Sequence, residues 1–218
     1  MPRKPRTAKT TPTASPGPKA RPGALDRVID AALDEAAALG WRALTLAGVA
    51  ARAGLEFGDV LVLTPTKHCL LARYLDRIDQ QTLGPVRMPD PRDKPRDRLF
   101  EIIMRRFDVL NRHRAGSRAV IVGVARDPVA MALAGLRLRR ALAAMLAASD
   151  IPADGLVGCL RIQGLKGVCL VTLRAWMNDD SSDMAKTMAA LDRALGQAER
   201  LARFLPAGRR RAAEAASA

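Results

Sequence analysis

The sequence predicts an all-α protein, and three observations lead to this prediction. Apolar residues recur at steps of three and four along nearly all of the 218 residues, as on one face of a helix. The alternation of apolar and polar residues that is typical of strands is almost missing. Glycine, proline and hydroxyl residues separate the helical patterns where helices end and begin. Aromatic residues are only 3% of the chain, which disfavours a domain built on stacking against bases, sugars or flavins.

The first two helices have clear ends. Apolar residues at helical spacing predict a helix over residues 25–39, and Gly40 ends it because glycine terminates helices at little steric cost. Thr45 is placed to cap a second helix over residues 46–53. Gly54 stops that helix in the same way.

A short apolar stretch, residues 56–63, precedes the next helix, for which Thr66 is the expected cap. This longer helix carries one apolar face, formed by Leu70, Leu71, Tyr74, Leu75 and Ile78. Residues 84–96 then hold four prolines among charged residues, which is typical of a linker. We therefore expect a domain boundary there.

The second half of the chain is again helical in pattern. A helix is predicted through residues 99–110, a short one around Val120, and one that begins at Asp127–Pro128 and ends near residue 147. A nearly unbroken apolar segment over residues 156–177 follows. The polar residues 178–182 end it and cap the last helix.

The last helix has the clearest pattern, with apolar residues at alternating steps of four and three up to residue 205. With segment 156–177 it would form a hairpin that pairs with its own copy as a two-fold four-helix bundle, so we expect a homodimer. The alternative is that this seam packs inside one chain. The expected interface residues are Met184, Met188, Leu191, Leu195, Ala198 and Ala202.

The charge is distributed unevenly along the chain. Of the net +14, residues 1–22 contribute +6 with no acid, and they also hold six prolines, so we expect a disordered basic tail. Residues 206–218 form a second basic tail. Between them we expect a helical unit over 23–83, the linker over 84–96, and a larger helical domain over 97–205. The tails would contact nucleic-acid phosphates or anionic lipid headgroups, or serve only solubility.

Catalysis finds little support, and we expect neither an enzyme nor a metal or cofactor site. His68 and His113 stand apart, and His68 is expected to be solvated. Cys159 and Cys169 lie about 15 Å apart along one helix, too far for a disulfide or a shared metal. No apolar run approaches the ~20 residues that span a bilayer, and no hydrophobic signal region opens the chain. We therefore expect a cytoplasmic protein.

The order of helices in the first unit, with a tight turn before a short third helix, is that of a helix-turn-helix. Its residues resemble the tetracycline-repressor (TetR) superfamily. The resemblance is carried by residues 28–33, 40–41, 44–46, 49–55, 58, 65–67 and 70–71. It implies a TetR-like helical fold in which a ligand-binding and dimerisation domain follows a DNA-binding unit. The residues then expected at DNA are Arg21, Arg27, Thr45 and Lys67.

The short third helix departs from this pattern where bases would be read. Residues 56–63 read Glu-Phe-Gly-Asp-Val-Leu-Val-Leu, with two carboxylates and no Arg, Lys, Asn or Gln. Such a helix has no side chain for the bidentate hydrogen bonds that identify bases in the major groove. This counts against sequence-specific DNA binding, and base readout would have to come from elsewhere, for example from Arg21 or Arg27.

The second half carries another resemblance. Residues 173–176, 179–184, 187–188 and 191–193, together with the early Gly40-Trp41, are similar to the lipid-binding accessory proteins of coenzyme Q (ubiquinone) biosynthesis. That family uses the TetR fold to hold lipids and has an amphipathic C-terminal membrane helix. The sequence after Leu205 shows no such apolar face, because Pro206-Ala-Gly and an arginine cluster follow.

This second resemblance implies a non-catalytic protein that holds an isoprenoid or quinone-precursor lipid. The protein would present the lipid to membrane-associated biosynthetic enzymes while peripheral to the inner membrane. The expected pocket residues are Met104, Phe107, Ile162, Leu165, Val168, Leu173 and Trp176. Core packing is the alternative for each of them. Lipid binding is the first hypothesis from the sequence, and a TetR-type ligand-responsive DNA-binding regulator is the second.

Overall fold

The computed structural model describes residues 23–84, 94–181 and 183–202, and within these residues it contains helices and no strand. The all-α prediction is confirmed. Both predicted tails, with Arg21, lie outside the described residues, as do residues 85–93 of the predicted linker.

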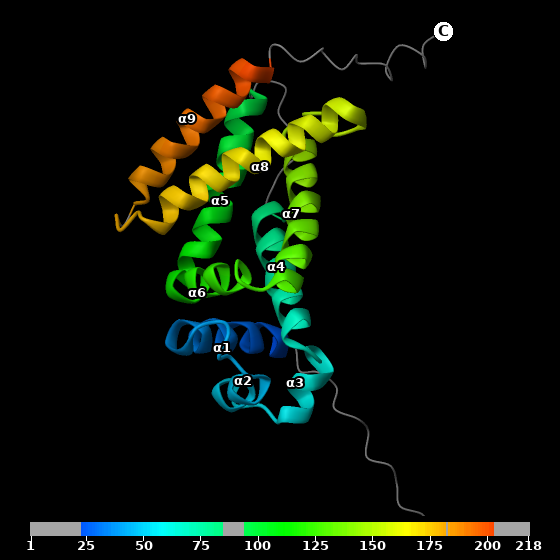
Figure 1. Cartoon of the computed structure of the whole chain (residues 1–218), viewed down its shortest axis with the longest axis vertical. Helices are drawn as coiled ribbons and strands as arrows, with labels where there is room; N and C mark the ends of the chain where they lie inside the picture. The colour runs from blue at the N-terminus through cyan, green and yellow to red at the C-terminus, as the bar shows by residue number, and fades with distance from the viewer. Residues whose placement is uncertain (1–22, 85–93, 182, 203–218) are drawn as a thin grey trace, which may run out of the picture.

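The helices follow the predicted order (Figure 1). Four form the first unit: α1 (Ala24–Leu39), α2 (Leu46–Ala53), α3 (Phe57–Leu63) and α4 (Lys67–Leu83). Five form the rest: α5 (Pro95–Arg112), α6 (Arg114–Val124), α7 (Pro128–Ala148), α8 (Gly155–Met177) and α9 (Ala185–Ala202). The first three helices lie at one end of the elongated molecule, and α8 and α9 lie toward the other. The long helix α4 runs from α3 into the larger domain, where it packs on α5 and α7.

The predicted caps of α2, α4 and α7 and the glycine end of α2 are confirmed. The Thr45 Oγ1 accepts a hydrogen bond from the Gly48 N–H at 3.1 Å, and the Thr66 Oγ1 accepts one from the Cys69 N–H at 3.1 Å. Gly54 has φ of 62°, a left-handed conformation that glycine adopts without steric cost. The Asp127 carboxylate accepts from the first two free N–H groups of α7. These caps fix where α2, α4 and α7 start.

Two boundaries differ from the prediction. Helix α5 begins at Pro95, so the end of the predicted linker is helical, because proline is tolerated in a first helical turn. Met184, predicted on the last helix, precedes α9 in a turn with φ of 54°. Asp179 holds this turn by accepting hydrogen bonds from the N–H and hydroxyl of Thr187, at 2.8 and 2.7 Å.

Two glycines let α6 pack closely on the first unit. A Cβ at Gly116 would lie 2.3 Å from the Leu33 carbonyl oxygen of α1, and one at Gly123 would lie 2.4 Å from the Trp41 Cβ. Trp41 is itself buried in the core. The first unit is therefore packed directly against the larger domain, and buried residues of both belong to one hydrophobic cluster.

Helix α8 corrects the expectation that no segment is long and apolar enough to span a membrane. In the described part of the chain, α8 alone passes that test as a single helix, with a mean hydropathy of 1.5 over its best window. A second candidate arises only if α6 and α7, which are bent by 114° at their junction, are taken as one span. Only 28% of the α8 window is buried inside the chain. The helix thus presents an apolar face that its own chain leaves uncovered.

Candidate functional site

The helix-turn-helix, helices α2 and α3, is held on α1 by a partly buried ion pair. The Arg52 Nε of α2 lies 3.2 Å from the Glu35 Oε2 of α1, and the Glu35 side chain is almost fully buried. Gly48 makes this approach possible, because a Cβ there would lie 2.0 Å from the Glu35 Oε1. The pair therefore sets how α2 sits on α1.

Helix α3 packs Val60 and Leu63 against the core and presents an apolar surface outward. Val60 is buried, whereas Phe57 is 47% and Val62 70% exposed, and Leu61 is exposed beside them. The surrounding unit, residues 23–84, carries six basic against eight acidic side chains. The positive charge expected of a DNA-binding surface is thus missing from this unit, and the described larger domain carries the excess of basic residues.

Three of the residues predicted to contact DNA lie in the described part of the chain. Arg27 is exposed on α1, and Thr45 is exposed but its hydroxyl caps α2. Lys67 donates a hydrogen bond to the Arg42 carbonyl oxygen at 3.1 Å, and its ammonium lies 5.0 Å from the centre of the Trp41 ring. Partial burial lowers the pKa of Lys67, against an opposing effect of Asp127.

The residues predicted to form a lipid pocket come together in the hydrophobic core. Met104 and Leu173 are partly buried, and the centres of the Phe107 and Trp176 rings lie 6.3 Å apart. The fully buried members are Phe107, Ile162, Leu165, Val168 and Trp176. The indole N–H of Trp176 is buried without a hydrogen-bond partner. These positions fit a well-packed core, and they also surround a polar atom that a ligand's acceptor would satisfy.

The residues predicted at the dimer interface divide into two groups. Met184, Leu191 and Leu195 are buried inside the chain, where α9 packs on α8 and α5, while Ala198 is half-buried. Met188 and Ala202 are exposed. Most of the apolar face of α9 thus packs inside its own chain. This is the alternative that the sequence left open beside a dimer interface. Helix α8 itself carries exposed large apolar side chains, at Leu156, Leu160, Leu170 and Val171.

Both histidines pair with an aspartate where the first unit meets the larger domain, which the sequence pattern did not indicate. The His68 Nε2 of α4 lies 3.3 Å from the Asp127 Oδ2 that caps α7, so His68 is not simply solvated as expected. The His113 Nε2 lies 3.4 Å from the Asp30 Oδ1 of α1. Only the folded chain brings these partners together, since they are far apart in sequence.

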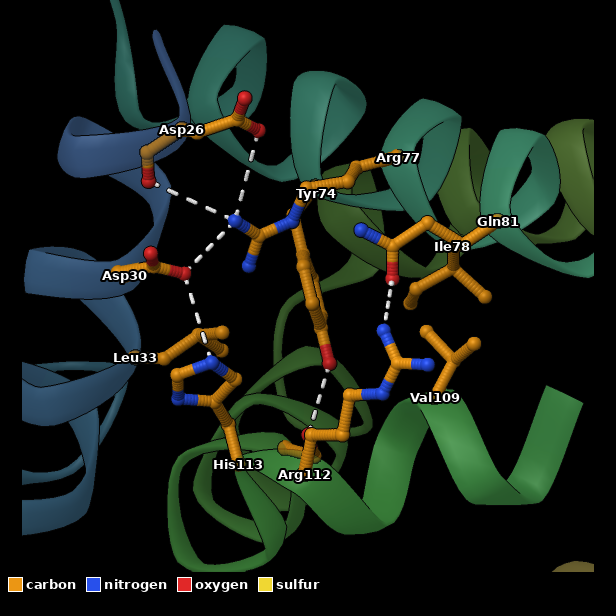
Figure 2. Close-up of a pocket in the computed structure, with 11 residues that line it drawn as sticks. Asp26, Asp30, Leu33, Tyr74, Arg77, Ile78, Gln81, Val109, Arg112 and His113 are labelled. Carbon is orange, nitrogen blue, oxygen red and sulfur yellow. Dashed lines mark hydrogen bonds and ion pairs between the residues drawn. The ribbon is translucent and has the colours of Figure 1, made fainter. Parts of the chain in front are cut away.

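A polar cavity of about 250 Å³ lies in the same region, between α1, α4 and the junction of α5 and α6 (Figure 2). Its charged residues are Asp26, Asp30, Arg77 and Arg112, and His113 also lines it. Among the described residues, no three His, Cys, Asp or Glu side chains gather as a metal-ligand set. The cavity is a second candidate site that sequence reasoning missed.

Solved structures similar to this chain are TetR-type regulators. A TetR transcriptional regulator from Nitrosomonas europaea aligns over 81% of this chain and 98% of its own, with 23% identity and a TM-score of 0.67. A TetR transcriptional regulator from Rhodococcus sp. RHA1 aligns over 82% and 96%, with 23% identity and a TM-score of 0.59. The chain has a TetR-like fold.

A third similar structure is that of the multidrug binding protein EbrR in complex with imidazole, at 22% identity and a TM-score of 0.53 over 85% of this chain and 97% of its own. At these identities the likeness defines the fold alone. No protein-family model matches the sequence, and no curated protein is significantly similar to it. The TetR part of the sequence resemblance is confirmed at the level of fold, while the relationship to ubiquinone accessory proteins is not shown.

Proposed function

We propose that the protein is a dimeric, ligand-responsive DNA-binding regulator of the TetR type that acts in the cytoplasm. One observation carries this proposal: a complete helix-turn-helix stands exposed at one end of a TetR-like fold, with both threonine caps made. The sequence alone put lipid binding first and the regulator second. The order is reversed here because the proteins with similar folds are transcriptional regulators. Lipid presentation for ubiquinone synthesis becomes the second candidate.

DNA recognition would rest on apolar contacts and on the basic N-terminal segment. Phe57, Leu61 and Val62 offer contacts to the C5-methyl groups of thymines, which mark A·T pairs in the major groove. Residues 1–22 supply six positive charges for phosphates, which offset the acidic excess of residues 23–84. Arg21, Arg27 and Thr45 remain expected DNA contacts, and Lys67 supports the turn before α2 through its hydrogen bond to the Arg42 carbonyl oxygen.

Dimerisation would use the uncovered face of α8. Its exposed leucines and Val171 need a partner surface, because patches of large apolar side chains mark interaction sites. Met188 and Ala202 are exposed on α9, which packs on α8, and they would extend the interface. The effector would enter the core between Met104, Leu173 and Trp176, where the unpaired indole N–H offers a hydrogen bond.

The second candidate is a non-catalytic protein that holds an isoprenoid or quinone-like lipid for membrane-associated enzymes. The exposed apolar face of α3 and the acidic excess around it favour this candidate. Native mass spectrometry followed by organic extraction would identify such a lipid. A stoichiometric quinone precursor in a protein that binds every duplex equally would establish the second candidate.

The test of the regulator is fluorescence anisotropy on two duplexes. One is the DNA upstream of the protein's own gene, and the other is a shuffled duplex of the same composition. We expect the first to bind about a thousandfold more tightly, as specific regulators do. Equal binding of both duplexes would contradict a regulator that controls its own gene.

A further inference from the structure

The polar cavity between α1 and the α5–α6 junction has a form that a small ligand can fill (Figure 2). Its volume of about 250 Å³ lies just below the range of pockets that bind drug-sized molecules. Leu33, Ile78 and Val109 supply an apolar part of the wall. The Tyr74 hydroxyl and the Ser117 Oγ lie 2.8 Å apart and satisfy each other, so these two groups shape the cavity without needing a ligand.

The α1 wall of the cavity carries more negative than positive charge. The Arg77 Nη1 lies 2.7 Å from the Asp30 Oδ1 and 3.7 Å from the Asp26 Oδ1, and the Arg77 side chain is only 13% exposed. One guanidinium thus pairs with two carboxylates, and its ion pair with Asp26 is the longer and weaker of the two. His113 adds a second partner to Asp30 and none to Asp26. Asp26 therefore remains able to bind a cationic group.

The α5 wall carries the opposite charge. The Arg112 Nη1 donates to the neutral Gln81 Oε1 at 3.3 Å, and within the described part of the chain Arg112 forms no salt bridge. Its guanidinium keeps further N–H donors, arranged in the fork that matches a carboxylate. Figure 2 shows Arg112 and Gln81 on one side of the cavity and the two aspartates of α1 on the other.

We propose that this cavity binds a small zwitterion of amino-acid size. The ligand's ammonium group would bind Asp26, its carboxylate would bind Arg112, and its carbon skeleton would lie against Leu33, Ile78 and Val109. Such a ligand bridges α1 and α5 and so ties the first unit to the larger domain. The inference holds whether or not the protein binds DNA, because it concerns this cavity alone.

The test is isothermal titration calorimetry of the full chain against the twenty proteinogenic L-amino acids, followed by two derivatives of the strongest binder. We expect saturable binding of at least one amino acid. Its methyl ester and its N-acetyl form should each bind about tenfold more weakly or worse, since each loses one charge-assisted interaction. No binding at 10 mM by any amino acid, or equal binding of the derivatives, would overturn the proposal.

Matched variants locate the binding. Arg112→Gln and Asp26→Asn should each weaken the amino acid by about tenfold or more. The controls are Arg139→Gln, on the exposed face of α7, and Asp34→Asn, exposed further along α1, and both should bind as the wild type does. Circular dichroism verifies the fold of each variant. Affinity unchanged in the cavity variants, or inorganic phosphate competing as well as the amino acid, would show that the cavity is not a zwitterion site.

Discussion

Asp179 organises the turn between α8 and α9 from a fully buried position. Its carboxylate accepts hydrogen bonds from the Ser181 N–H and hydroxyl and from the Thr187 N–H and hydroxyl. Its own carbonyl oxygen accepts one from Arg114, which also stacks over Trp176. Asp179 is therefore the acceptor that fixes this turn, whereas the exposed Asp180 carboxylate takes no part in these hydrogen bonds.

Replacing Asp179 with asparagine should destabilise the protein by about 2 kcal/mol, because a charged acceptor of several hydrogen bonds is lost. Burial would raise the pKa of Asp179, but the bonds from Ser181 and Thr187 outweigh it and hold the pKa well below its usual value. The stabilisation is therefore complete above pH ~4, the usual aspartate range, and is lost as the pH falls through the lowered pKa.

Urea unfolding at several pH values measures this effect. The wild type should lose stability below pH ~4 more steeply than Asp179→Asn does, and Asp180→Asn, at an exposed neighbour, serves as the control. Identical acid profiles for wild type and Asp179→Asn would refute the role assigned to Asp179.

At the scale of single elements, α6 depends on close approach to α1. Gly116→Ala would force a Cβ into the Leu33 carbonyl, where backbone cannot yield, and should cost about 1–3 kcal/mol. Gly135→Ala on α7 meets no atom within 4 Å and should instead stabilise its helix by up to about 1 kcal/mol. Thermal unfolding followed by circular dichroism compares them, and equal melting temperatures would contradict the close packing of α1 on α6.

Helix positions followed from the sequence because their causes are local. Thr45, Thr66 and Asp127 cap helices through bonds to residues two or three positions on, which sequence spacing reveals. The seam on α9 shows the limit, since periodicity identifies a buried face but not the surface that covers it. Leu191 faces its own chain, and the uncovered face belongs to α8, whose apolar residues surround the helix too evenly to mark a side.

The cavity was harder to predict because the residues that form it are far apart in sequence. The cavity pairs Asp26 and Asp30 with Arg77 and His113, which lie dozens of positions later in the chain. No spacing rule links residues that only packing brings together. The apolar character of residues 60–63, by contrast, was visible in the sequence, and the structure adds that Val62 points outward while Val60 points inward.

At the scale of the whole molecule, the uncovered face of α8 determines the expected assembly. Leu170 is 50% exposed in the single chain. Leu170→Asp should convert the dimer to a folded monomer, because dimerisation would bury the new carboxylate without a partner. Leu136→Asp on α7, at a site 64% exposed, should leave the dimer intact. Sedimentation velocity decides between them, and a Leu170→Asp variant that remains dimeric would place the interface elsewhere.

The basic N-terminal segment should provide much of any DNA affinity. Deleting residues 1–22 removes six positive charges, so the slope of log affinity against log salt should become less steep by up to about five. Anisotropy between 50 and 200 mM salt measures this slope for both chains. An unchanged slope would mean that these charges do not contact phosphates.

The most direct test of a TetR-type regulator is selection of bound duplexes from a random-sequence DNA library, followed by sequencing. A dimer with two helix-turn-helix units should enrich a two-fold symmetric site whose half-sites lie about one helical turn, or a multiple of it, apart. Thymines should mark the positions that α3 contacts. If no sequence is enriched over the starting library, the protein binds all duplexes equally well. That result would contradict sequence-specific regulation and leave lipid binding as the function to pursue.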